Sequence, residues 1–295
     1  MSSTNDRPPS WSPHNASAFQ LADVVEHYHL RAPYPSALFP FLRDLAVPPR
    51  GAVIELGCGT GEITRALAPH TERIDAIDVS HQMIERARSM PGGDHPAIRW
   101  IEGRSEDAPL NGPYALAVAG ASLHWMDWDI TLPRLECNLS PGAVLAIVVS
   151  TGPPPWGDEL HKLTSRYSAI QNWENFDLIA LLEERQLFKR LGEQTIAAEP
   201  YQRTVEQYFD GLHATSGLAR DRMDRRLVAD VRNPLDTPYS SSLTALLAQQ
   251  ALSRPTDHPN LGELVDAPRQ KLGSQDKEHE PGDAEEAAQV DTQAA

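Results

Sequence analysis

The sequence predicts an α/β fold in which a parallel sheet carries helices on both faces. Two features of residues 52–149 indicate this fold. Five short apolar runs with the character of strands alternate with segments of helical periodicity, and a glycine-rich turn joins the first run to the first helix. Parallel strands need a crossover connection, which is usually a helix, so this alternation is typical of a parallel sheet that is covered on both sides.

Strands are expected where short runs are rich in β-branched and other apolar residues, at 52–56, 73–77, 98–101, 114–119 and 143–149. Helices are expected where apolar residues return every three or four positions, at 19–29, 36–45, 62–68, 80–90, 130–139, 160–170, 176–191 and 204–212. Ser36 and Thr204 are candidate N-caps of two of these helices.

Composition limits the possible partners and the compartment. The chain has 295 residues and a net charge of −15, which argues against nucleic acid and anionic membranes as partners because both attract cations. It contains no apolar run of the roughly 18 residues that cross a bilayer, and residues 1–15 lack the apolar core of a secretory signal. Cys58 and Cys137 have neither metal-ligand nor disulfide spacing. We expect a cytoplasmic monomer or homodimer without a metal site.

Both ends of the chain differ in composition from the middle. Residues 1–20 are polar and rich in proline, so we expect a flexible arm. Residues 254–295 are acidic and contain no aromatic residue. Such a segment buries too little apolar surface to offset the entropy of ordering, so we expect a disordered tail.

A turn with alternating glycines follows the first expected strand, at Gly57, Gly59 and Gly61. Glycine permits a sharp turn and the close approach of a ligand, and the free N–H groups of the next helix face that ligand. Asp78 ends the second expected strand. A carboxylate in this place lies beside a nucleoside ribose and accepts hydrogen bonds from its hydroxyls.

The turn differs from the two common phosphate-binding motifs. The dinucleotide fingerprint requires a third glycine at the position where this chain has Glu62, and no lysine follows as in a P-loop. The spacing therefore favours a ligand that has a ribose but no pyrophosphate.

Glu55–Gly61 with Asp78 resembles the class I S-adenosylmethionine-dependent methyltransferases. Four further segments are similar to motifs of the small-molecule branch that includes trans-aconitate methyltransferase: Tyr28–Pro35, Gly103–Asp107, Ala121–Trp125 and Leu139–Gly142. The resemblance implies a Rossmann-like, seven-stranded and mostly parallel sheet with a helical cap over the active site. It implies a methyltransferase domain at 21–253, with the cofactor-binding half at 45–150 and the cap and last strands at 151–253.

The resemblance also implies S-adenosyl-L-methionine as cofactor and a set of residues that bind it. In that set the glycines line the methionine portion and ribose, while Asp78 holds the ribose hydroxyls. The implied cofactor-binding residues are Tyr28, Arg31, Glu55, Gly57, Gly59, Gly61, Asp78, Val79, Met83, Ser105, Glu106, Gly120 and Ala121. For Glu55, a structural hydrogen bond and direct ligand contact both stay open.

His124 follows the fourth expected strand, at the sheet edge where α/β folds bind ligands. The ordinary pKa of histidine suits a general base, although packing against the cofactor would explain its position equally well. Trp125, Trp128 and Tyr208 are candidates for the substrate pocket.

We therefore expect O- or C-methylation of a small-molecule metabolite by direct in-line transfer, which leaves S-adenosylhomocysteine. Two alternatives stay open at this point. One is a cyclase or another enzyme that uses the same cofactor fold, and the other is a non-catalytic regulatory module that binds S-adenosylmethionine.

Overall fold

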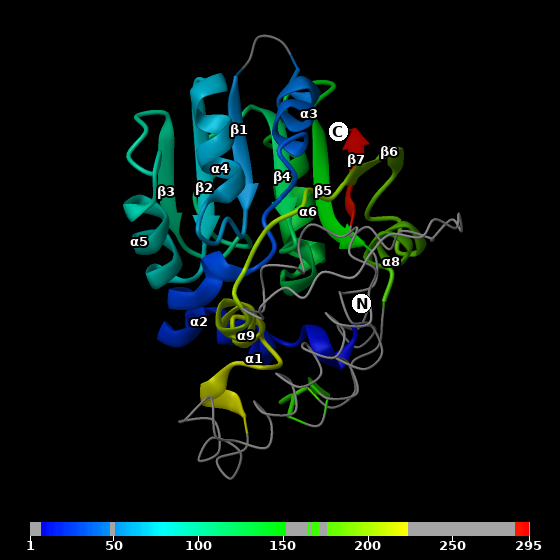
Figure 1. The fold of residues 1–295 in the computed structure, drawn as a ribbon. Coiled ribbons are helices and arrows are strands. Elements are labelled where there is room, and N and C mark those ends of the chain that lie inside the picture. The colour runs from blue at the N-terminus through cyan, green and yellow to red at the C-terminus, as the bar shows by residue number, and fades with distance from the viewer. Residues whose placement is uncertain are drawn as a thin grey trace, which may run out of the picture.

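The computed structural model describes residues 7–47, 51–151, 164–165, 167–170, 176–223 and 287–294. Five strands form a parallel sheet in the order β3-β2-β1-β4-β5 (Figure 1). Their bounds are β1 (Ala52–Leu56), β2 (Arg73–Asp78), β3 (Ile98–Glu102), β4 (Tyr114–Gly120) and β5 (Val144–Thr151). The parallel α/β sheet predicted from the sequence is confirmed for these strands.

Helices and short 3-10 turns connect the strands or precede them, and the α-helices overlap ranges that the apolar periodicity predicted. They are α3 (Leu38–Leu45), α4 (Glu62–Leu67), the 3-10 turn η5 (Ala68–His70), α5 (His81–Ser89), η6 (Leu123–Trp125), α6 (Trp128–Glu136) and α8 (Leu178–Glu184). The start of α3 differs from the prediction, because Ala37 and not Ser36 precedes its first residue. The backbone N–H of Ser36 instead donates to the carboxylate of Glu199, at 2.9 Å.

The two faces of the sheet bury alternate residues of each strand. Val53 and Leu116 belong to the apolar cluster that includes α3 and α4. The next residue of each strand, Ile54 or Ala117, belongs to a second cluster with α6 and α8. Successive side chains of a strand point to opposite faces, so strands that are covered on both sides read as continuous apolar runs.

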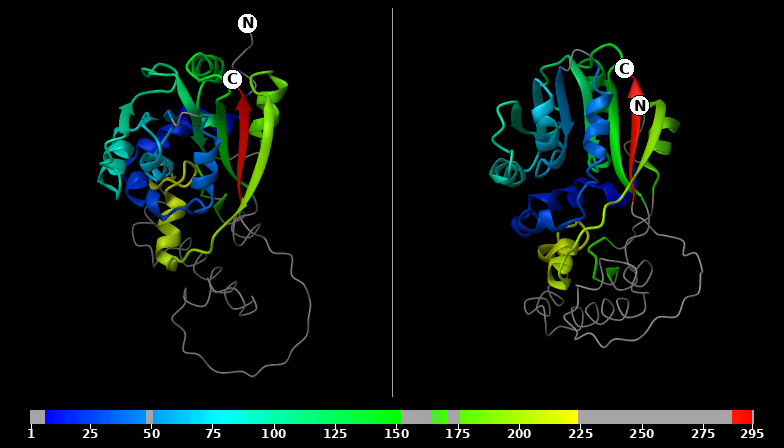
Figure 2. Two further views of the ribbon diagram at one scale, coloured as in Figure 1. Left: turned by 90° about the horizontal axis from the view of Figure 1, so that it is seen from above. Right: turned by 45° about the horizontal axis from the view of Figure 1, so that its top comes forward.

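Two antiparallel strands continue the sheet beyond β5. β7 (Ala287–Ala294) pairs with β5 along its length, and β6 (Arg190–Ala197) pairs with β7, as both views of Figure 2 show. The predicted disordered tail at 254–295 is therefore wrong for residues 287–294. Strands pair through their backbone N–H and C=O groups, and β5 offers a row of these groups along its edge. A segment with few large side chains can therefore join the sheet there. Residues 254–286 lie outside the described part of the chain.

The predicted helix over 176–191 is also partly wrong. Helix α8 ends at Glu184, and β6 begins at Arg190. Gly192, the residue after the predicted helix, lies in β6, where it coincides with a shift of register against β7. Glycine inside a strand often accompanies such an irregularity.

Residues 9–20 are not the flexible arm that their composition predicted. They form η2 (Pro9–Trp11), α1 (Pro13–Ala16) and η3 (Ser17–Gln20). Trp11 is 8% exposed and packs into the cluster beneath α6. Burial of one indole supplies the apolar contact that the surrounding polar residues lack.

Helices from the N-terminal segment and from residues 205–222 lie beyond the carboxyl ends of the parallel strands (Figure 1). These elements are α1, α2 (Ala22–His27), η4 (Tyr28–Leu30), α9 (Val205–His213) and η7 (Arg220–Arg222). Thr204 begins α9 with a capping box that it shares with Gln207, which confirms its predicted role as N-cap. In the described residues no helix combines the length and the apolar composition needed to cross a membrane.

A buried polar pair joins β2 to β4 below the site. The Tyr114 hydroxyl donates to the carboxylate of Asp75 at 2.7 Å and accepts from the Asn111 N–H at 2.8 Å. The Asp75 carboxylate also lies 3.1 Å from the guanidinium of Arg73. Burial, followed by the hydrogen bond to Asp75, raises the pKa of Tyr114 to about 12.

Replacement of Tyr114 by Phe should lower the free energy of unfolding by about 1–3 kcal/mol, because it removes the donor from one oxygen of the buried Asp75 carboxylate while keeping the ring. Urea unfolding of the wild-type and variant proteins measures this difference. The slope with which the free energy of unfolding falls with urea concentration should be the same for both. An unchanged midpoint would show that this hydrogen bond contributes nothing to stability.

Candidate functional site

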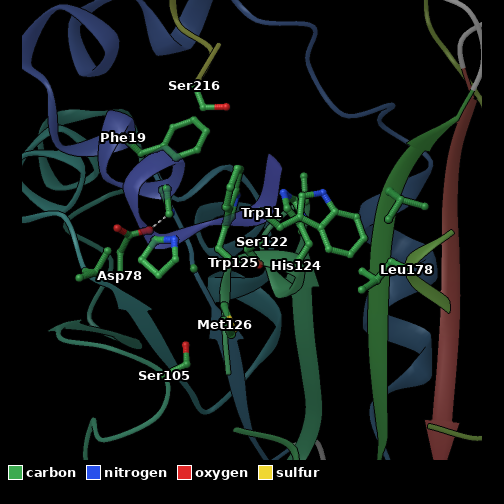
Figure 3. Close-up of a pocket in the computed structure, with 18 of the residues that line it drawn as sticks. Trp11, Phe19, Asp78, Ser105, Ser122, His124, Trp125, Met126, Leu178 and Ser216 are labelled. Carbon is green, nitrogen blue, oxygen red and sulfur yellow. Dashed lines mark hydrogen bonds between the residues drawn. The ribbon is translucent and has the colours of Figure 1, made fainter. Parts of the chain in front are cut away.

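A cavity of about 880 Å³ lies at the carboxyl edge of the parallel strands. Figure 3 shows Asp78 and Ser105 on one side of it, Leu178 on the other, and the rings of Trp11 and Trp125 between them. The predicted site residues that line the cavity are Tyr28, Arg31, Gly57, Gly59, Asp78, Val79, Met83, Ser105, Glu106, Gly120, Ala121, His124 and Trp125. Open parallel sheets bind ligands at this edge.

The glycine turn is attached to the end of β2 through Asp78. One carboxylate oxygen of Asp78 accepts from the Gly59 N–H at 2.7 Å, and the other accepts from the Ser80 N–H at 2.8 Å. Burial raises the pKa of Asp78, and these two hydrogen bonds oppose the rise. Each oxygen retains lone-pair capacity for a further donor, since a carboxylate offers about four acceptor sites.

Gly57 and Gly59 have φ angles of +67° and +53°, which glycine adopts without strain. A Cβ at Gly57 would lie 2.6 Å from the Cβ of Ser122. At Gly59 the nearest atoms belong to the ring and hydroxyl of Tyr28, at 3.7 Å or more. Gly57 therefore lets the turn approach the loop after β4, whereas Gly59 faces the open cavity.

Gly61 does not line the cavity, contrary to the role implied for it. Its φ is +72°, and an added Cβ would collide with the indole of Trp100 on β3. The absence of a side chain here allows β3 to pack against the start of α4. The need for glycine was visible in the sequence, but the partner that requires it was not.

Glu55 is also separated from the cavity. Its side chain is 3% exposed and hydrogen-bonds the hydroxyl of Thr64 on α4. Burial raises the pKa of Glu55 to about 8, although the bonds to Thr64 lower it. Two roles were left open for Glu55, and the structure places its side chain in a hydrogen bond with Thr64 and away from the cavity.

Cys58 lies within the glycine turn, but its thiol does not line the cavity. The side chain is buried, and its sulfur lies 3.9 Å from the carbonyl oxygen of Gly59. Burial, together with the negative charges of Asp78 and Glu55, raises the pKa of this thiol well above its usual range.

The loop after β3 is joined to the loop after β4. Glu106 accepts from the Asp127 N–H at 2.8 Å and lies 3.3 Å from the guanidinium of Arg104. Although burial raises the pKa of Glu106, the hydrogen bonds from Asp127 and Arg104 leave it below its usual value. Glu106 is therefore an ionised group at the edge of the cavity.

Ala121 begins the loop after β4 in the left-handed region, at a φ of 48°. Its N–H donates to the carbonyl of Val148 on β5, at 2.8 Å. Alanine in this conformation is strained, and such strain is common at ligand-binding sites.

His124 belongs to the same loop, and its ring lies next to two indoles, one from the N-terminal segment and one from the loop itself. Its ring centroid is 5.4 Å from that of Trp11 and 4.4 Å from that of Trp125. Burial, assisted by the positive charges of Arg31 and Arg7, lowers the pKa of His124 to about 4. The imidazole is neutral at pH 7, so it can accept a hydrogen bond, but it is a weak base.

Two candidates for the substrate pocket do not line the cavity. Trp128 is 2% exposed, and its indole N–H donates to the carbonyl of Leu123 at 2.8 Å. The guanidinium of Arg7 lies 4.5 Å from the centre of this ring, and Arg7 also donates to the carbonyls of His124 and Met126. Trp128 thus supports the His124 loop from below. Tyr208, on α9, is likewise not among the lining residues.

Many residues that line the cavity were not predicted from the sequence. They include Trp11, Pro13, Ala16, Ser17, Phe19, Gln20, Phe176, Leu178, Ile179, Thr215 and Ser216. Trp11 and Phe19 are large aromatic residues within a polar segment, and this contrast was the one available signal. The other residues lie in segments whose position in the fold cannot be predicted from patterns in the neighbouring sequence.

Comparison with known proteins agrees with this geometry. Residues 53–142 match the family model described as a methyltransferase domain. Over these residues the chain is similar to a methyltransferase domain. The matched residues run from β1 to the turn before β5, so they include the glycine turn, Asp78 and His124.

Curated methyltransferases resemble the chain over a wider region. It is 32% identical over 183 residues to a malonyl-[acyl-carrier protein] O-methyltransferase of Halalkalibacterium halodurans, which is 57% of this chain and 66% of that protein. It is 32% identical over 175 residues to a trans-aconitate 2-methyltransferase of Streptomyces coelicolor, which is 56% of this chain and 52% of that protein. The chain thus spans less than two thirds of the length of these relatives.

A solved structure shares the fold of the methyltransferase domain and its neighbouring elements. It comes from Anaeromyxobacter dehalogenans and is provisionally assigned as a type II methyltransferase. The TM-score is 0.55 at 22% identity, with 89% of this chain and 95% of the other covered.

Replacement of Gly61 by Ala should destabilise the methyltransferase domain more than replacement of Gly92 by Ala. Gly61 and Gly92 have φ angles of +72° and +81°, so each alanine has a similar backbone cost of about 1–2 kcal/mol. A Cβ at Gly92 meets only Arg65, at 3.9 Å, whereas one at Gly61 meets Trp100. Thermal unfolding should separate the two variants by at least about 1 kcal/mol, and equal losses would contradict the packing role of Gly61.

His124 should gain its proton near pH 4 and not near its ordinary value of 6.5. Proton–carbon NMR of the histidine rings over a range of pH measures the midpoint of this titration. The signal of His124 is the one that is missing from the spectrum of the His124→Gln variant. Replacement of Arg31 by Gln should raise the midpoint, because a positive neighbour disfavours the imidazolium. The unfolded chain binds this proton more tightly, so the His124 contribution also lowers native stability as the pH falls from 6.5 towards 4. A midpoint at or above 6.5 would overturn the assignment of a ring that is neutral at pH 7.

Proposed function

We propose that the protein transfers a methyl group from S-adenosyl-L-methionine to a small-molecule acceptor. The observation that carries this proposal is the carboxylate of Asp78, which faces the cavity beside the Gly57–Gly59 turn with lone pairs left for ribose hydroxyls. The match of residues 53–142 to a methyltransferase domain supports the same conclusion.

The residues around Asp78 fit a nucleoside. Val79 is 48% exposed, and it is one of the few large apolar side chains in the described residues to be so open. It lines the cavity next to Met83, where the two side chains would pack against an adenine ring. Ser105 and Glu106 border the same region and offer acceptors to an amino group.

The opposite end of such a ligand would meet Tyr28 and Arg31. The guanidinium of Arg31 donates to the Tyr28 hydroxyl at 3.1 Å and lies 5.0 Å from the centre of its ring. Arg31 retains further donors, because a guanidinium has five N–H groups. We therefore assign the amino-acid portion of the cofactor to this pair, and Gly120 and Ala121 to the reactive centre between.

When bound, S-adenosyl-L-methionine supplies a methyl carbon already activated by a positive sulfur. The chain must then hold the acceptor in line with that carbon and exclude water, since positioning alone lowers the barrier substantially. His124 borders the acceptor side as a neutral imidazole and would orient an acceptor hydroxyl by accepting its hydrogen bond. The helices α1, α2 and α9 lie over this edge of the sheet, and we assign them the role of the cap.

The two other functions that the sequence left open gain no support from the comparisons. The relatives described above are named as methyltransferases, one acting on malonyl-[acyl-carrier protein] and the other on trans-aconitate. A cyclase or a regulatory module would also bind the cofactor, so binding and turnover must both be measured.

Replacement of Asp78 by Asn should weaken the binding of S-adenosylhomocysteine about tenfold to a hundredfold, because charge-assisted hydrogen bonds to the ribose are lost. Calorimetric titration measures this change. The control is Glu102→Gln, since Glu102 pairs with Asp78 in the ladder but is exposed and bonds His81. Unchanged affinity in the Asp78 variant, with its fold intact by circular dichroism, would refute the ribose assignment.

Turnover separates an enzyme from a binding module. The protein is incubated with methyl-labelled S-adenosyl-L-methionine and a metabolite extract, and label should pass to small molecules while S-adenosylhomocysteine forms. Asp78→Asn should slow both processes and Glu102→Gln should not. Binding of the cofactor without any transfer of label would favour the regulatory module.

A further inference from the structure

Aromatic rings line the cavity in an unbroken row. Successive pairs of ring centroids lie 5.9 Å apart for Phe176 and Trp11, 5.4 Å for Trp11 and His124, and 4.4 Å for His124 and Trp125. The row continues through Phe19, 5.7 Å from Trp125. We call Phe176, Trp11, His124, Trp125 and Phe19 the aromatic wall, and all five line the cavity.

Neighbouring rings of the aromatic wall are tilted or edge-to-face, with interplanar angles from 47° to 63°. Such a surface presents ring faces and ring edges together. An added aromatic ring finds both kinds of contact there, which are the two favourable arrangements of aromatic pairs. Leu178 and Ile179 extend the apolar surface beyond Phe176.

The charged groups at this end of the cavity already have partners. Arg190 lies 2.7 Å from the carboxylate of Glu193 and 3.7 Å from that of Glu183. The side chain of Asp177 caps α8 by accepting from the Ala180 N–H at 3.0 Å. In the described part of the chain, the lining residues beside the aromatic wall thus offer rings, aliphatic groups and neutral hydroxyls more readily than free cations.

We propose that the methyl acceptor is a neutral, planar aromatic molecule bound against the aromatic wall. This inference rests on the proposed function, because it assigns the Asp78 side of the cavity to the cofactor and the Phe176 side to the acceptor. The His124 ring lies between those of Trp11 and Trp125, so an acceptor ring packed over this part of the wall has its substituent next to His124. A hydroxyl substituent donates to the neutral imidazole there.

The proposal distinguishes this chain from the relative named for trans-aconitate. A tricarboxylate would have to lose its hydration against apolar rings, and burial of unpaired charges is expensive. Arg104, another arginine of the cavity, lies on the Asp78 side and pairs with Glu106. The aromatic wall therefore disfavours an acceptor with several carboxylates.

The test is calorimetric titration of the full chain saturated with S-adenosylhomocysteine. Three probes are compared: 2-naphthol, which is neutral and planar, 1-octanol, which is neutral and flexible, and trans-aconitate. We expect 2-naphthol to bind at least about tenfold more tightly than either of the others, as one or two added aromatic contacts would produce. Phe176→Leu should weaken 2-naphthol about fivefold or more and leave the affinity for S-adenosylhomocysteine unchanged.

Phe39→Leu is the matched control, because Phe39 lies on α3 and belongs to the apolar cluster on the opposite face of the sheet. It should change neither affinity. Trp11→Phe is a second variant that keeps a ring in the wall, so 2-naphthol should bind it more tightly than it binds Trp11→Ala.

Three results would overturn the proposal while cofactor binding stays intact. Tighter binding of trans-aconitate would refute the neutral acceptor, and equal binding of 1-octanol would refute the planar one. Equal affinity of 2-naphthol for wild type and Phe176→Leu would refute the aromatic wall as its site. Failure of the proposed function itself looks different, since either S-adenosylhomocysteine would not bind or no label would pass from S-adenosyl-L-methionine to any small molecule.

Discussion

The two hydrogen bonds that Asp78 accepts determine where the whole site lies. They attach the glycine turn after β1 to the start of α5 after β2. The Cys58 N–H adds a third link, because it donates to the carbonyl of Ile77 at 2.9 Å. Parallel pairing of β1 and β2 brings these groups to one edge of the sheet. The conformation of the turn and the position of the carboxylate are thus specified by the same contacts.

The other side of the cavity depends on contacts between distant parts of the chain. The segment that carries Trp11 is held at one end by Arg7, which donates to two carbonyls of the His124 loop. Near its other end, Arg222 donates to the carbonyls of His14 and Asn15 and to the hydroxyl of Ser17. Guanidinium groups can bond several carbonyls at once, so two arginines suffice to hold a short segment with few apolar residues.

The nucleoside side of the cavity could be predicted from the sequence because its signals are local. The glycines, Asp78 and the neighbouring strands lie close together in the chain, and their periodicity predicts their placement. The roles of Glu55, Gly61 and Trp128 could not be predicted in this way. Each depends on a partner from another element, namely Thr64, Trp100 and Arg7.

The same reasoning explains the errors at both ends of the chain. Residues 9–20 are ordered by burial of Trp11 against the His124 loop, which lies more than a hundred residues away. β7 is specified by the free edge of β5, and a backbone edge leaves no pattern in the side chains of the strand that joins it. Composition reports the average character of a segment, whereas one buried ring or one unpaired edge is enough to order it.

Cys58 has a consequence for the durability of the protein. It lies in the turn assigned to a methyl donor, and sulfur nucleophiles attack electrophilic carbon as thiolates and not as thiols. Burial and the carboxylates of Asp78 and Glu55 keep this thiol protonated. The acidic surroundings of the turn therefore also keep its buried sulfur in the thiol form, which reacts poorly with electrophilic carbon.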